Sequence, residues 1–252
     1  MANEIALDFG TLDLDSTNNI TINSISTTEN KTTKESQIPK MDGSVAEEGK
    51  RGSLIITIAG DIAGSNYDDL RTNIDTLRAG LHNGIQSLTI DDDRYIKAQL
   101  QNFKFQVESM RVLAKWTAKF IAHYPFWLAA SATTDTRTPT TGVGYVINNS
   151  GNAIARVKIT FTGPGSDRAN DLQIENTTKG QLCKFRGTIA ATKILEIDNR
   201  YDTDDFEVLN DGVDAHSSFE GDFITLDPGN NTIEITSATM PEVTITFRAT
   251  YY

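Results

Sequence analysis

The sequence predicts a mainly β protein of two domains, with a single amphipathic helix in the first domain and a β-sandwich in the second. Three observations predict this. Short segments that alternate apolar and polar residues recur along most of the chain, as half-buried strands do. Only one segment, within residues 65–84, has its large aliphatic residues at helical spacing. A stretch rich in small residues and threonine, Ala129 to Gly144, separates two halves and predicts a linker.

Composition fits a soluble globular chain and excludes several functions. Of 252 residues, 38% are hydrophobic and 23% charged, and no apolar run approaches the ~20 residues of a membrane helix. The N-terminal MANEIALDFG has neither a basic nor an apolar signal region, so we expect synthesis in the cytoplasm and no membrane insertion. The net charge of −11 opposes tight binding of nucleic acid, which needs clustered cations, and suits a surface past which DNA slides.

The first strong strand is preceded by a long polar segment, Thr27 to Ser53. Its sparse apolar and turn residues give it no core face, so we expect a disordered loop or an arm that orders against a partner. The residues of this segment that could contact another subunit are Ile38, Pro39, Met41 and Val45.

The rest of the first half alternates strands with one helix. A strand is predicted by the alternation of Leu54, Ile56 and Ile58. The helix then follows, with Ser65 or Asn66 as its N-terminal cap and Gly84 at its end. Its apolar stripe should pack on a sheet and consists of Leu70, Ile74, Leu77 and Leu81.

Two further strands should form a hairpin that turns on Asp91 to Asp93. The second of them changes phase, because Ile96, Ala98 and Leu100 share one parity and Phe103, Phe105 and Val107 the other. A shift of one residue without a turn predicts a β-bulge near Asn102. The following strand alternates Trp116, Ala118 and Phe120 with polar residues and ends before Pro125.

The second half contains only strand and turn patterns. Short strands are predicted at ARVKITFT, LQIE, LCKF, ILEID and FEVL, at the spacing of a β-sandwich. FITLDPGNNTIEIT reads as strand, tight turn and strand, since Pro228 presets φ and Gly229 can take a positive φ. The last strand should direct to one face Val243, Ile245, Phe247, Ala249 and Tyr251. The single cysteine, Cys183, should be a small buried hydrophobe.

No pattern of catalytic, metal-binding or cofactor-binding residues is present. The three histidines lie in unrelated contexts without ligand spacing, and no nucleophile or phosphate-loop motif occurs. We therefore expect no enzyme, no catalytic residue, no metal and no cofactor. The eight acids between Tyr201 and Asp222, like Asp91 to Asp93, are predicted to be solvated surface, with a calcium loop or a pair of glycosidase carboxylates as alternatives.

The order of the motifs resembles one family, the siphophage distal tail (Dit) proteins. The likeness covers nearly the whole chain. In the second half it rests on SGNAIARVKITFTG, LQIENTTKGQL, ILEIDNR, VLNDG, ITLDPGNNTIEIT and VTITFRATYY. In the first half it rests on QIPKMDGS, GSLIITIAGDI, the amphipathic helix and YPFW.

The resemblance implies a structural virion protein at the distal end of a phage tail. It implies a sandwich-like ring-forming domain at 1–130, a linker at 131–144 and a galectin-like β-sandwich at 145–252, with an arm at about 27–53 that reaches the neighbouring subunit. Such proteins form a hexameric ring through which DNA passes without specific binding. The implied partners are the tail tube protein, the tail tip or baseplate hub protein, and a receptor-binding protein.

Two other classes of function remain open from the residues. One is a carbohydrate-binding, lectin-like module for host surface glycans, which would bind glycans as a monomer. The other is a glycoside hydrolase that uses the acidic stretch, which would require two carboxylates facing one cleft.

Overall fold

The computed structural model covers all 252 residues and describes 7–14, 19–37, 44–90, 93–108, 112–138, 140, 142–163, 171–201, 206–237, 239 and 242–252. The chain divides into two compact units, Met1–Trp127 and Leu128–Tyr252. Within the predicted linker, 131–144, Thr133–Arg137 form a strand, β9, that pairs with strand β20 (Glu242–Phe247) of the second unit. Threonine favours extended strands, so TTDTR can form a strand although its composition is also typical of a linker.

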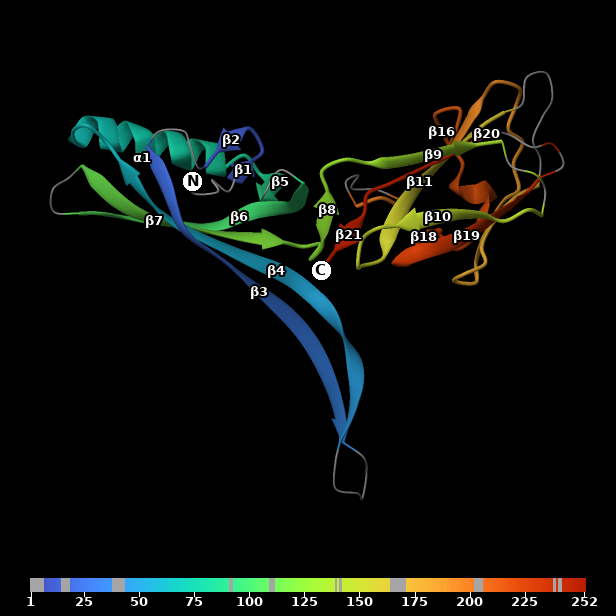
Figure 1. The fold of residues 1–252 in the computed structure, drawn as a ribbon, viewed down its shortest axis with the longest axis horizontal. Helices are drawn as coiled ribbons and strands as arrows, with labels where there is room; N and C mark the ends of the chain where they lie inside the picture. The colour runs from blue at the N-terminus through green and yellow to red at the C-terminus, as the bar shows by residue number, and fades with distance from the viewer. Residues whose placement is uncertain are drawn as a thin grey trace. The chain divides into compact units, whose positions relative to one another are not determined.

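The first unit is a twisted antiparallel sheet with one helix on it (Figure 1). Its strand order is β2-β1-β5-β6-β7-β4-β3. The elements are β1 (Leu7–Phe9), β2 (Leu12–Asp13), β3 (Ile20–Gln37), β4 (Ser44–Ala63), α1 (Tyr67–Leu81), β5 (Ile85–Ile90), β6 (Arg94–Val107) and β7 (Leu113–Ala122), with β8 (Trp127–Ala129) at the boundary between the units.

Helix α1 buries the stripe that its sequence spacing predicted. Leu70, Leu77 and Leu81 are fully buried and Ile74 nearly so, packed with residues of β1, β4, β5 and β7. The cap is Asn66, whose side chain accepts a hydrogen bond of 3.0 Å from the Asp69 backbone N–H. The apolar stripe therefore fixes α1 against the sheet, as predicted.

Strand β6 is long and changes partner midway. Its first part pairs with β5, from Arg94↔Ile90 to Gln99↔Ile85, and its second part pairs with β7, from Gln99↔Ile121 to Val107↔Ala114. The register shifts between Leu100 and Asn102, so the predicted bulge is confirmed. A bulge bends a strand, which lets β6 pass from one part of the sheet to another.

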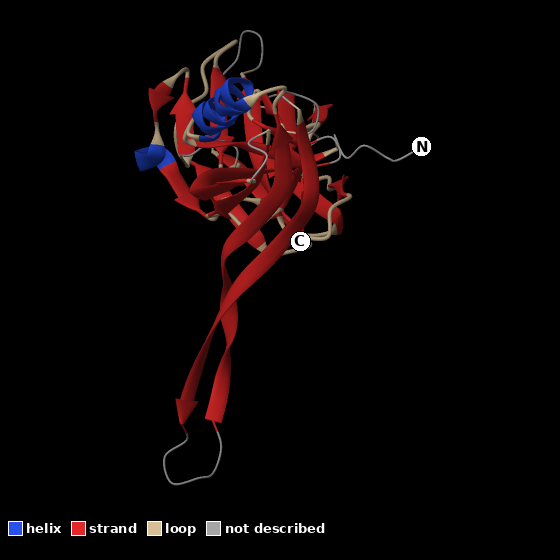
Figure 2. Cartoon of the chain, turned by 90° about the vertical axis from the view of Figure 1, so that its left-hand side faces the viewer, coloured by secondary structure: helices blue, strands red, loops and turns tan. Residues whose placement is uncertain are grey.

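Strands β3 and β4 form a hairpin that is much longer than the rest of the sheet (Figures 1 and 2). The pairing of β4 with β7 begins at Leu54, so the hairpin beyond Glu29↔Leu54 is a two-stranded ribbon that reaches Gln37↔Ser44. The sequence predicted a loop or arm here. The structure pairs much of this segment with itself as two strands, because threonine-rich chain favours strands even without a core face.

The second unit is a β-sandwich of two antiparallel sheets. One sheet has the order β10-β19-β12-β13-β17, and the other β16-β15-β14-β11-β20-β9, with β18 beside β11. The elements not yet given are β10 (Tyr145–Asn149), β11 (Ala155–Thr162), β12 (Leu172–Asn176), β13 (Gln181–Phe185), β14 (Ile194–Asp198), β15 (Glu207–Asn210), β16 (Val213–Asp214), the 3-10 turn η1 (His216–Ser218), β17 (Phe219–Gly221), β18 (Thr225–Leu226), β19 (Gly229–Thr236) and β21 (Thr250–Tyr251). Residues of both sheets share one buried core, including Ile174, Ile233, Phe161 and Ile245.

The predicted turn in FITLDPGNNTIEIT is present, and Gly229 has a φ of +87°. Its flanking strands do not pair with each other, however: β18 pairs with β11, whereas β19 pairs with β10 and β12. The turn thus carries the chain from one sheet to the other instead of closing a hairpin.

Side-chain amides of buried asparagines hold this crossing segment. Each donates to a different backbone carbonyl, at distances of 2.8–3.2 Å: Asn199 to Ile224, Asn176 to Thr225, Asn149 to Leu226 and Asn231 to Asp227. Since buried carbonyls without partners are costly, these amides stabilise a segment that only briefly joins a sheet.

The final strand pattern is correct up to Ala249 and wrong beyond it. Val243, Ile245 and Phe247 are buried in β20, but Thr250 is 1% exposed and Tyr251 half-buried, the reverse of the prediction. The strand stops at Phe247, and Arg248 donates hydrogen bonds to the carbonyls of Ala129 and Ala130. This interruption shifts the alternation by one residue.

Cys183 is buried in β13, and burial raises the pKa of its thiol to about 12. The thiolate is the reactive form, so we expect no reaction with a thiol reagent at mildly alkaline pH in the native protein. Full reaction should follow unfolding in guanidinium chloride. Rapid labelling of native protein would contradict the buried position.

Candidate assembly surface

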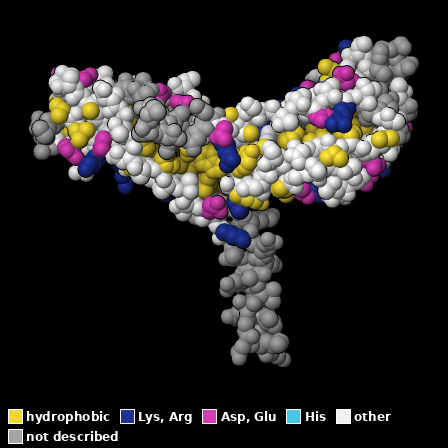
Figure 3. Space-filling model, in the orientation of Figure 1, with side chains coloured by type: hydrophobic (Ala, Val, Ile, Leu, Met, Phe, Trp, Pro, Cys, Tyr) yellow, Lys and Arg dark blue, Asp and Glu magenta, His cyan; other side chains and the backbone are white. Residues whose placement is uncertain are grey.

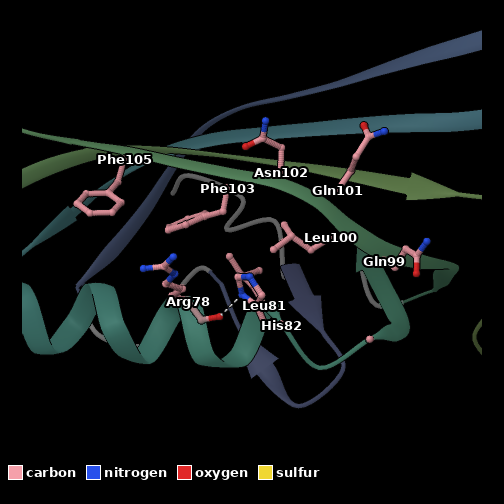
Figure 4. Close-up of a pocket in the computed structure, with 10 residues that line it drawn as sticks. Arg78, Leu81, His82, Gln99, Leu100, Gln101, Asn102, Phe103 and Phe105 are labelled. Carbon is pink, nitrogen blue, oxygen red and sulfur yellow. Dashed lines mark hydrogen bonds between the residues drawn. The ribbon is translucent and has the colours of Figure 1, made fainter.

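A groove of the first unit lies between the C-terminal part of α1 and strand β6. Its volume is about 350 Å³. It is lined by Arg78, Leu81, His82, Gly84, Gln99, Leu100, Gln101, Asn102, Phe103 and Phe105 (Figure 4).

The bulge in β6 directs two phenylalanines into this groove. Phe103 and Phe105 point toward α1, whereas Asn102 points away (Figure 4). Their strand partners are Ala118 and Trp116, both buried, so the two rings extend the apolar face of the sheet. The ring centroids of Phe103 and Phe105 lie 6.2 Å apart. Phe105 is nevertheless 46% exposed, so the apolar layer is incompletely covered at this margin.

On its helix side, the groove has polar residues at the rim and an apolar residue at the base. Leu81 is fully buried, and the Nδ1 of His82 donates to the Arg78 carbonyl at 2.8 Å. No carboxylate among the described residues forms an ion pair with the Arg78 guanidinium. The groove therefore combines exposed aromatic surface with a cation at its rim.

The sheet has two open edges in the part of the chain that the structure describes. Strand β3 ends the strand order, and its known partner is β4 alone. At the other end of the strand order lies β2, whose known partner is β1. Open edges present unpaired N–H and C=O groups and are templates for strand addition.

The face of this sheet that points away from the core is polar, but it is not acidic. Lys104, Lys115 and Lys119 lie on this face, because along β6 and β7 they alternate with the residues that face the core. Asp61 is opposite Lys115, and Lys115 also forms an ion pair of 3.3 Å with Glu108. The excess negative charge of the chain is thus carried elsewhere.

The predicted contact residues of the arm fall mostly outside the described residues. This applies to Ile38, Pro39 and Met41. Val45 lies in β4, where its backbone is opposite Ser36. Their role as subunit contacts stays a prediction.

The three histidines lie in separate places. His82 lines the groove, His123 contacts Gln99 at 3.0 Å, and His216 bonds to Asp214. Among the described residues, no three groups of metal-ligand type cluster. Described acids of the 201–222 stretch form surface interactions, such as Glu220 with Arg186 at 3.0 Å, while Asp202, Asp204 and Asp205 lie outside the described residues.

His216 has hydrogen-bond acceptors at both ring nitrogens. Nδ1 is 2.6 Å from the Asp214 carboxylate, and Nε2 is 3.0 Å from the Phe206 carbonyl. Only the doubly protonated ring can donate to both, so these bonds, Asp214 first, raise the pKa of His216 above its ordinary 6.5. Folding thus gains stability from this group below pH 6.5, and loses it as the pH rises through the folded-state value.

We therefore expect the imidazole of His216 to titrate above 6.5 when followed by NMR. Asp214→Asn should move its pKa downward, because the carboxylate is the main cause of the shift. Glu220→Gln, which alters another surface ion pair, should leave it unchanged. A value at or below 6.5 in the unaltered protein would contradict the double hydrogen bond.

Sequence reasoning did not identify the groove, although one signal pointed to it. The phase change in β6 predicted the bulge and hence the side to which Phe103 and Phe105 turn. No sequence pattern indicated Arg78 or His82, since their position beside β6 depends on how the helix crosses the sheet.

Comparison with known proteins identifies relatives of this fold. Residues 150–251 match the family described as siphovirus-type tail component, C-terminal domain. The crystal structure of the Dit protein of phage SPP1, described as a paradigm of the hub adsorption apparatus in phages that infect Gram-positive bacteria, superimposes with a TM-score of 0.78 at 17% identity. That match covers 98% of this chain and 99% of the SPP1 protein.

A chain of the phage p2 baseplate, solved in its activated conformation with strontium, matches with a TM-score of 0.51 at 9% identity. It covers 96% of this chain and 97% of that one. No curated protein sequence matches. The mainly β fold with one helix, predicted from the sequence, is confirmed. No helix in the described ranges has the length and apolar character needed to cross a membrane.

Proposed function

We propose that this chain, whose residues 150–251 match a siphovirus-type tail component family, is a structural part of the phage tail and not an enzyme. We propose further that it forms the hub at the distal end of the tail. The hub would be a closed ring, of six copies by resemblance to distal tail proteins. It would join the tail tube protein on one side to the tail tip or baseplate hub protein on the other.

One observation carries the proposal: the likeness to the SPP1 hub protein includes both units. The superposition leaves almost nothing of either chain unmatched, at 98% and 99% coverage. A lectin module alone would need only the second unit. The likeness therefore extends over the first unit, with its hairpin and helix-bearing sheet, and over the sandwich of the second.

The geometry of the first unit supports ring formation. Its described sheet ends in the edge strands β2 and β3, so one copy can offer both halves of a heterologous contact. The ribbon of β3 and β4 continues beyond the sheet, and we propose that it lies on the neighbouring subunit. Ile38, Pro39, Met41 and Val45 would provide its apolar contacts.

The two units would have different roles in the hub. The ring would be built by residues 1–130 and the outward-facing domain by residues 145–252, which would take a receptor-binding protein. DNA would pass through the lumen without specific contacts. Because sequence-specific recognition needs side chains that reach base edges, a smooth polar lumen would serve passage alone.

Imaging of labelled particles tests this function. A gold-labelled antibody against the second unit should mark one position per particle, at the tip of the tail. Particles that lack the gene should have tubes without a tip and should fail to adsorb. Label at the capsid or along the whole tube would overturn the assignment, whatever the structure of the contacts between subunits.

A further inference from the structure

We infer that Asn83 is a site of spontaneous covalent modification, at which the side-chain amide cyclises onto the backbone nitrogen of Gly84 and is converted to a carboxylate. The reaction is deamidation, and it needs water and no other reagent. It goes beyond the hub function and does not depend on it, because no neighbouring copy takes part.

The sequence distinguishes Asn83 from the other asparagines of the chain. Asn83 and Gly84 form the single Asn–Gly pair, and every other asparagine is followed by a residue that has a side chain. Because glycine has no Cβ and adopts many backbone conformations, its nitrogen can approach the preceding side chain with the least crowding. The Asn–Gly pair is therefore where ring closure meets the smallest steric barrier.

The turn between α1 and β5 leaves the two reacting groups room to move. Asn83 and Gly84 are exposed and lie after the last residue of the helix and before the first residue of the strand. Gly84 has a φ of +77°, and a Cβ built on it would meet nothing within 4 Å. Gln86 donates to the backbone carbonyl of Asn83 at 2.9 Å, but within the described ranges neither the Asn83 side-chain amide nor the Gly84 N–H has a hydrogen-bond partner. Such a turn samples the geometry of ring closure at little cost.

The reaction balances with water as the only co-reactant. The Gly84 nitrogen loses its proton to solvent and attacks Cγ of Asn83, so that a bond forms between them while the bond from Cγ to the amide nitrogen breaks. Ammonia leaves with the proton, and the product is a succinimide ring. Water then opens the ring at one of its two carbonyls. Opening at Cγ gives aspartate, and opening at the main-chain carbonyl gives isoaspartate, whose backbone runs through Cγ.

Asn73, in the same helix region, is held against this reaction. It is 9% exposed, and its side-chain amide donates to the Ala63 carbonyl at 2.9 Å. The residue after it lies inside α1, where the backbone N–H groups are hydrogen-bonded along the helix and the backbone keeps one conformation. Asn73 therefore provides an internal reference for Asn83.

The product changes the groove between α1 and β6. His82 and Gly84, the two neighbours of Asn83, both line this groove. The reaction adds a negative charge beside the C-terminal end of α1, where the helix dipole disfavours a carboxylate. Isoaspartate also lengthens the backbone between Leu81 and Leu88, both of which are fully buried. We therefore expect the modified chain to unfold at a lower temperature than the unmodified chain.

Peptide mapping of the full-length protein after incubation at mildly alkaline pH tests the inference. Trypsin cleaves after Arg78 and Arg94 and gives a peptide whose single asparagine is Asn83, while the peptide before it, which begins at Thr72, contains Asn73 alone. The Asn83 peptide should gain the mass difference between an amide and an acid and should be methylated by an isoaspartyl methyltransferase. The Asn73 peptide should be modified at least tenfold less. Equal modification of both peptides, or none at Asn83, would overturn the inference.

Asn83→Gln is the matched variant for the effect on stability. Glutamine keeps the amide, but it would have to close a larger ring, so the variant should stay unmodified and keep its melting temperature during the incubation. The melting temperature of the unaltered protein should fall as the modified fraction rises. An equal fall in both proteins would contradict the link between Asn83 and stability. Because the measurement uses the isolated chain, its outcome is independent of whether the chain forms a hub.

Discussion

Leu77→Asp is expected to unfold the first unit while the second unit stays folded. Leu77 is fully buried on the core side of α1, in a cluster that contains residues of strands β1, β3, β4, β5, β6 and β7. A carboxylate there would lose its hydration among apolar side chains. Burial of an unpaired charge costs several kcal/mol, a large part of the ~5–15 kcal/mol that stabilises a domain.

Tryptophan fluorescence can report this change for the first unit alone. The chain has two tryptophans, Trp116 and Trp127, and both belong to that unit. In Leu77→Asp the emission should shift to the red at room temperature. Thr76→Asp, at the adjacent exposed position, is the matched control and should keep the native spectrum.

The second unit can be followed in the same sample. Its folding should persist as protection of Cys183 from thiol reagents, since that residue lies in the core of the sandwich. Native fluorescence of Leu77→Asp would show that the stripe faces solvent or a partner. Loss of Cys183 protection would show that the two units unfold together.

Deletion of Glu35 to Lys50 is expected to abolish or strongly weaken ring formation while both units remain folded. The deletion removes much of the ribbon in which β3 and β4 pair only with each other. The retained pairs, from Ile20↔Ile62 to Glu29↔Leu54, keep β3 on the sheet, so the core should not change. What is lost is the surface that the ribbon would bury on a neighbour.

Native mass spectrometry across a concentration series, together with incorporation into tails, measures the effect. A control that replaces Ile38, Met41 and Val45 by serine keeps the length of the ribbon and removes its apolar side chains. If both variants fail to assemble, side-chain contacts hold the ribbon. If the deletion assembles normally, the arm has no part in the ring.

The elements that depend on residues close together in sequence were predictable from local patterns. The helix followed from four aliphatic residues at helical spacing, and the bulge followed from a change of parity around Asn102. A helix depends on the spacing of its apolar residues and on nearby capping residues, and a bulge changes the alternation of a strand. Both can be read directly from the sequence. The β-rich second unit was predictable for the same reason, since Val157, Ile159 and Phe161 alternate without interruption.

Partners that are distant in sequence were not predictable. β18 and β19 look like a hairpin, yet amides from residues as distant as Asn149 and Asn176 hold the connecting segment between two sheets. Thr133–Arg137 looks like a linker until β20 supplies its pairing partner. The groove depended on such long-range placement as well, because Arg78 meets Phe105 only after the sheet has folded under the helix.

The bulge between Leu100 and Asn102 also sets where the chain tolerates changes in length. Without the extra residue there, each following side chain of β6 would move to the opposite face, since side chains alternate with a period of two. Lys104 would then point at the core, and both phenylalanines would point away from α1. Single-residue insertions and deletions between Gln99 and Val107 should therefore be strongly selected against in descendants of this gene.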